Sequence, residues 1–137
     1  MVISPPDRIN YFIGVVLLTY RSNEGEYSDE EYVQKFVRIL RFDPAFYEFT
    51  VRNVLNNIQA IDDPPSFAGH EIAKIFIKDC LRIAFIRGTI DTETLNWLYQ
   101  VVKKNQLREE WFAKELLFFL TGKTDPSVGA LEIEKYV

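Results

Sequence analysis

Apolar residues cover every face of residues 9–18 and almost every face of residues 72–86. A helix without a polar face is normally buried in the core of a protein, so both segments predict central helices. Each segment is followed by a glycine, Gly25 or Gly88, and then by a segment whose apolar residues recur at helical spacing. The pattern predicts an all-α fold, a compact bundle of six to seven helices with an internal two-fold pseudo-repeat.

Turn and cap residues divide this pattern into separate helices. The predicted helices cover about residues 8–21, 28–41, 43–61, 67–87, 91–105 and 108–120. Asp7, Asp43 and Asp91 are predicted to cap the first, third and fifth helices, because an aspartate side chain can accept a hydrogen bond from the first turn. Ser28 and Glu31 are predicted to form a capping box at the start of the second helix.

Gly14 lies inside the first predicted helix, where glycine costs about 1 kcal/mol of helix stability relative to alanine. It therefore predicts the close approach of another helix. Gly122 is predicted to end the last helix, and residues 123–137 are expected to form a loosely packed tail. We expect one helical domain, residues 1–137, with a core of about residues 8–122.

The composition limits the classes of function. Twenty acidic against 16 basic residues give a net charge of −4, without the basic stripe that nucleic-acid binding needs. Cys80 is the single cysteine, which excludes an internal disulfide and a cysteine-based zinc site. The longest apolar run, residues 11–20, is shorter than the about 20 residues of a membrane-spanning helix. We therefore expect a cytoplasmic protein with no nucleic-acid partner and no membrane insertion.

Two corners follow the apolar segments and share a short motif. Residues 24–30 are Glu-Gly-Glu-Tyr-Ser-Asp-Glu, and residues 87–93 are Arg-Gly-Thr-Ile-Asp-Thr-Glu. These corners, each between an apolar and an amphipathic helix, resemble the tellurite-resistance TerB-like family, whose pattern has an Asp-Gly-x-apolar-Ser/Asp-x-Glu corner at both places. The pattern is also similar to the N-terminal domain of membrane-anchored J-domain co-chaperones. The resemblance covers about residues 9–120.

The resemblance implies a metal site at the corners. Family members are thought to bind a divalent cation through the corner acids, which carries over to Glu24, Glu30 and Glu93. Calcium or magnesium would fit, because carboxylates are hard ligands and no cysteine or histidine lies nearby. Arg87 stands where the family has an acid, and its positive charge would repel a cation.

The resemblance also implies a function, a non-enzymatic protein-interaction or stress-response module with an unknown protein partner. Two alternatives stay open. One is a metal-dependent enzyme that uses the corner carboxylates, and the other is a structural domain that forms a homodimer. Tellurite resistance itself does not follow from the fold, because one fold hosts many roles.

Other residues offer little chemistry. The corner acids could serve only as helix caps, since negative charge is favourable at a helix N-terminus. His70 is the single histidine, and it forms no recognisable catalytic pair, so no catalytic residue is expected. Cys80, Trp97 and Trp111 are expected in the core, and an exposed tryptophan would mark a partner site.

Overall fold

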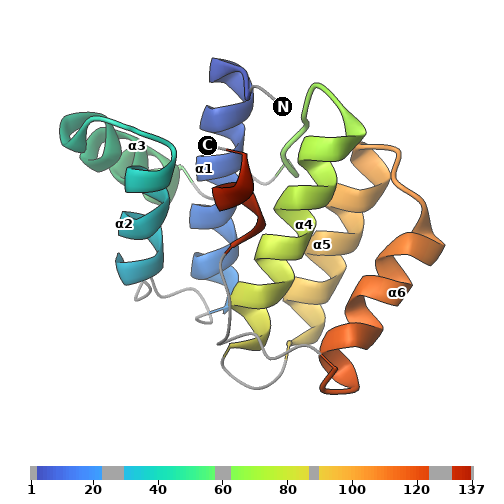
Figure 1. Ribbon diagram of the computed structural model, residues 1–137. Coiled ribbons are helices and arrows are strands. Elements are labelled where there is room, and N and C mark those ends of the chain that lie inside the picture. Colours follow the sequence, from blue (N-terminus) through green and yellow to red (C-terminus); the bar gives the residue numbers. More distant parts are fainter. Residues whose placement is uncertain (1–2, 23–29, 58–62, 87–89, 124–130, 137) are drawn as a thin grey trace.

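Six α-helices and one short 3-10 helix make up the part of the chain that the computed structural model describes, residues 3–22, 30–57, 63–86, 90–123 and 131–136. No strand occurs in these ranges (Figure 1). The elements are α1 (Pro5–Ser22), α2 (Glu30–Ile39), α3 (Pro44–Asn56), α4 (His70–Phe85), α5 (Thr92–Lys104), α6 (Glu109–Leu120) and η1 (Glu132–Lys135). The predicted all-α bundle is confirmed.

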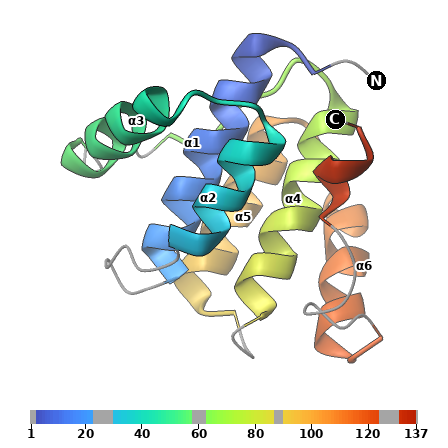
Figure 2. The same cartoon turned by 60° about the vertical axis from the view of Figure 1, so that its left-hand side comes forward.

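The two apolar helices α1 and α4 lie side by side at the centre of the bundle (Figures 1 and 2). Helices α2 and α3 pack against α1, whereas α5 and α6 pack against α4. Every α1 residue from Tyr11 to Thr19 except Ile13 is buried, and eleven residues of α4 are buried. The two segments without a polar face therefore form the core, as their pattern predicts.

Gly14 of α1 lies directly against the ring of Phe76 on α4. A Cβ atom at this position would lie 2.5 Å from Cζ of Phe76 on α4 and 3.1 Å from Cγ of Pro65. The Phe76 ring cannot easily move, because its centroid lies 5.1 Å from the ring of Tyr11 and 5.2 Å from that of Phe67. The predicted close approach at Gly14 is confirmed.

Gly14→Ala is therefore expected to destabilise the protein by about 1–2 kcal/mol, because the clash with Phe76 outweighs the gain in helix propensity. Urea unfolding measures the change. Gly69→Ala is the matched control, since a Cβ there meets nothing within 4 Å. A Gly14→Ala variant more stable than the wild type would contradict this account of the contact.

Two of the three predicted aspartate caps are confirmed. Asp43 accepts a hydrogen bond from Ala45 N at 2.8 Å, and Asp91 accepts one from Thr94 N at 2.6 Å. The third prediction, Asp7, is wrong. Helix α1 begins earlier, at Pro5, and Asp7 instead accepts a hydrogen bond from the backbone of residue 68 at 3.0 Å.

The start of α1 has a simple cause. Two prolines open the helix, and a proline suits the first turn because its missing N–H has no helical partner there. Ser4 precedes them, and its Oγ accepts a hydrogen bond from the backbone N of Asp7 at 3.3 Å. Ser28 of the predicted capping box lies outside the described residues.

Helices α2 and α5 end in the same way. Arg41 and Gln106 have φ values of 60° and 56°, in the left-handed region. The next residue in each case bonds back to the helix, Phe42 N to Val37 O and Leu107 N to Val102 O, both at 3.0 Å. These are Schellman motifs, and each leads directly into the following helix. The C-terminal ends of α2 and α5 are thus alike, whereas a two-fold repeat of the whole bundle stays a prediction.

The end of the chain differs from the expected loose tail. Leu131 and Ile133 are only 2% and 0% exposed, and η1 packs against α4. Lys35 of α2 pairs with Glu134 at 3.3 Å, so η1 bridges α2 and α4. The predicted loose packing is wrong for residues 131–136. Gly122 does end α6, with a φ of 71°.

Candidate functional site

The three predicted metal ligands are not brought together by any described contact. Glu24 lies outside the described residues, and Glu30 begins α2 but its side chain is not described. Glu93 is exposed in the first turn of α5. Within the described ranges no group of three His, Cys, Asp or Glu side chains is suitably placed for a metal ion. Binding of calcium or magnesium at these acids stays a prediction.

The other singled-out residues lie mostly where the sequence predicts. Cys80 is fully buried and His70 is exposed at the start of α4. Trp97 is buried, whereas Trp111 is half-buried with the ammonium of Lys74 5.4 Å from its ring centroid. Of the helices described, none has both the length and the apolar character of a membrane span.

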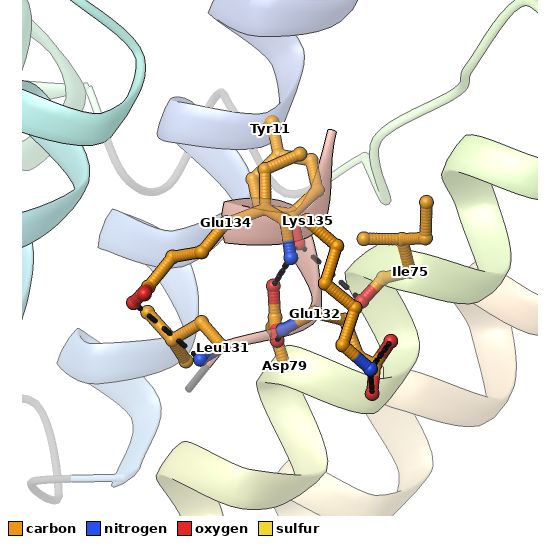
Figure 3. A network of polar contacts seen from close by, with 8 residues as sticks. Tyr11, Ile75, Asp79, Leu131, Glu132, Glu134 and Lys135 are labelled. Carbon is orange, nitrogen blue, oxygen red and sulfur yellow. Dashed lines mark hydrogen bonds and ion pairs between the residues drawn. The ribbon is translucent and has the colours of Figure 1, made fainter. Parts of the chain in front are cut away.

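A buried carboxylate that the sequence analysis missed lies in the middle of α4. Asp79 is 0% exposed. Its Oδ1 accepts a hydrogen bond from Glu132 N at 2.6 Å, and its Oδ2 accepts from Ile133 N at 3.2 Å. Oδ2 also accepts from the hydroxyl of Tyr11 at 2.5 Å (Figure 3). One side chain of α4 thus joins α1 to the C-terminal segment.

These hydrogen bonds lower the free-energy cost of burying the Asp79 carboxylate. Without partners, a carboxylate in the interior costs several kcal/mol. Burial raises the pKa of Asp79 from 3.8 to about 6, and the hydrogen bonds from Tyr11, Glu132 and Ile133 offset only part of that rise. Burial and the charge of Asp79 raise the pKa of Tyr11 well above 10.

The Asp79–Tyr11 pair has the chemistry of an acid–base couple, but both side chains are fully buried. A catalytic group must reach its substrate within hydrogen-bonding distance. The pair is therefore a structural contact that holds residues 131–136 against the central helices, and we expect it to contribute to the stability of the fold.

An open groove between α5 and α6 is the second feature. It has a volume of about 780 Å³ and is lined by Thr92, Glu93, Leu95, Asn96, Tyr99, Glu109, Phe112, Ala113 and Leu116. Its surface is mainly apolar. Among the described residues that line it, two side chains are charged, and both are carboxylates. Mostly apolar concave surfaces with a few polar groups are typical of binding sites.

Helix α6 also exposes apolar residues that do not line the groove. Leu117, Phe118 and Leu120 are 54%, 46% and 58% exposed. Phe112 is the one residue of α6 that is buried. A helix with apolar residues on most faces is normally covered, and α6 lies at the edge of the bundle, where α4 and α5 pack against it.

Comparison of the chain with protein-family models, with curated proteins and with solved structures gives no match.

Proposed function

We propose that the chain is a non-enzymatic protein-interaction module that binds its partner on α6 and in the groove between α5 and α6. The observation that carries the proposal is the exposure of Leu117, Phe118 and Leu120 on one edge helix. Large apolar side chains exposed together on one element are typical of protein interaction sites. The adjoining groove adds a concave site to it.

The alternatives draw less support. An enzyme that uses the corner carboxylates would need at least two acids in one pocket, and Glu93 and Glu109 line an open, mainly apolar groove. A homodimer through α6 would cover the same surface, and the experiment below separates it from a foreign partner. Membership of the TerB-like class, a stress-response role and a bound divalent cation rest on the resemblance alone.

Ala113→Arg tests the proposal. Ala113 is exposed and lines the groove, so a long charged side chain there fills the site without removing a core contact. Peptides selected from a displayed library of amphipathic helices against the wild type are expected to bind this variant at least about tenfold more weakly. Fluorescence anisotropy of labelled peptides measures the affinities.

Ala45→Arg is the matched control, because Ala45 is an exposed alanine on α3, away from the groove. Its affinities should equal those of the wild type. Peptides that bind Ala113→Arg as tightly as the wild type would overturn the proposal. A wild-type dimer that dissociates on Ala113→Arg, seen by sedimentation equilibrium, would favour the homodimer instead.

A further inference from the structure

The two acids of the groove lie at its opposite ends. Glu93 is in the first turn of α5 and Glu109 is in the first turn of α6. The short connection 105–108 reverses the chain, so that α5 and α6 run in opposite directions (Figure 1). The two helix N-termini, each with its acid, therefore face opposite ends of the groove.

The apolar floor of the groove has the length of two helical turns. Leu95 and Tyr99 contribute from α5, and Phe112 and Leu116 contribute from α6. From Glu109 to Leu116 the helix rises about 10 Å. A bound helix covers the same length between residues i and i+7, which is the spacing of the apolar anchors in helix-in-groove recognition.

Glu109 is held in position at its end of the groove. The hydroxyl of Tyr99 donates a hydrogen bond to its Oε1 at 2.5 Å. This hydrogen bond raises the pKa of Tyr99, so the tyrosine stays a neutral donor. The ammonium of Lys103 lies 5.5 Å from the Tyr99 ring centroid, but Lys103 is not among the residues that line the groove.

We infer that the groove takes an amphipathic helix whose apolar residues recur at i, i+3 or i+4, and i+7, with a lysine or arginine at each end of this stripe. The inference rests on the proposed function and names its partner. Charge complementarity is its basis, since Glu93 and Glu109, the charged residues among those described in the lining of the groove, are both carboxylates. A second copy of the chain fits less well, because its α6 begins with two glutamates.

Three labelled peptides with one apolar stripe test the inference. Their flanking residues are lysine in the first, glutamine in the second and glutamate in the third. Fluorescence anisotropy gives their affinities for the wild type and for the variants Glu93→Gln and Glu109→Gln. Glu48→Gln on α3 is the control, because Glu48 is exposed and does not line the groove.

The lysine-flanked peptide is expected to bind about tenfold more tightly than the glutamate-flanked one at low salt. Each groove variant should reduce that preference about two- to fivefold, as expected for exposed ion pairs. The control should leave the preference unchanged. Raising the salt from about 50 to about 300 mM should weaken it, because salt screens exposed charges.

Two results overturn the inference, and they are distinguishable. If the glutamine-flanked peptide binds as tightly as the lysine-flanked one, and Ala113→Arg still abolishes binding, the charge inference fails while the proposed function stands. If none of the three peptides binds, and the wild type is a dimer that Ala113→Arg dissociates, both fail, because a second copy occupies the groove.

Discussion

Replacing Asp79 by alanine is expected to lower the free energy of unfolding by about 2–4 kcal/mol at neutral pH, because buried donors lose their acceptor. The variant removes the acceptor of Glu132 N and Ile133 N. The Tyr11 hydroxyl loses its shorter partner and keeps only Ile75 O, at 3.3 Å. Buried donors without partners each cost about 1–3 kcal/mol. Urea unfolding at neutral pH measures the loss.

Asp79→Asn is the matched control, since it keeps the shape of the side chain. The asparagine oxygen can accept from Glu132 N, and its NH₂ group can donate to the Tyr11 oxygen while that hydroxyl turns to Ile75 O. Only the bond from Ile133 N is lost. We expect this variant to lose about 1–2 kcal/mol, less than Asp79→Ala, because one buried donor rather than three loses its acceptor.

Amide hydrogen exchange shows which part of the Asp79→Ala variant loses its structure. The amides of Glu132 and Ile133 should lose their protection, because residues 131–136 are then held to α4 mainly by Leu131 and Ile133. An Asp79→Ala variant with wild-type stability and protected amides would show that the C-terminal segment does not depend on this carboxylate.

The second large effect is a gain of stability in acid. The pKa of Asp79 is about 6 in the folded protein, against an ordinary value of 3.8. The folded state therefore binds this proton more tightly than the unfolded state. The resulting stabilisation is complete below about pH 4 and is lost as the pH rises through 6. A difference of about two pKa units corresponds to about 3 kcal/mol.

The hydrogen-bond network can accept this proton without releasing the C-terminal segment. The Tyr11 hydroxyl can turn to Ile75 O and accept a hydrogen bond from protonated Asp79, while Oδ1 still accepts from Glu132 N. Protonation of Asp79 in acid is thus expected to stabilise the folded protein. In most proteins protonation of a hydrogen-bonded carboxylate has the opposite effect.

Asp79→Asn isolates this effect from the other titrating groups, because asparagine carries no charge at any pH. The unfolding free energy of the wild type minus that of the variant should rise by about 2–2.5 kcal/mol between about pH 7 and about pH 4. The measurement is a series of urea titrations. A difference that is flat, or that falls in acid, would show that Asp79 has no raised pKa.

Local sequence signals predicted the helices well. Asp43 and Asp91 cap helices with the backbone of their own first turn, so a short stretch of sequence contains the whole interaction. The contact at Gly14 was predicted in one further step. A glycine lowers the stability of a helix, so a glycine inside a buried helix indicates that a neighbouring group approaches closely. The identity of that neighbour, Phe76, came only from the structure.

Asp79 needed information from distant parts of the chain, because its donors lie 68, 53 and 54 residues away. A signal was nevertheless present. Lys74, Lys78 and Arg82 recur every four residues and mark the partly exposed stripe of α4. Asp79 does not belong to that stripe, so a buried carboxylate with distant donors could have been predicted.

The groove depends on how far α6 is covered, which no local pattern specifies. The apolar residues of this segment predict a helix equally well whether it is central or at an edge. In the structure α4 and α5 cover one side, and Leu117 and Leu120 remain exposed. For the corner acids, Glu93 alone has a described side chain, so the metal prediction is unchanged by the structure.

Amide chemical-shift mapping with the lysine-flanked helix tests the proposed interaction surface most directly. The account predicts that the largest shifts occur in α5 from Thr92 to Tyr99 and in α6 from Glu109 to Leu120, with α2 and α3 unchanged. Shifts confined to α2 and α3, or no shifts at a saturating peptide concentration, would contradict it.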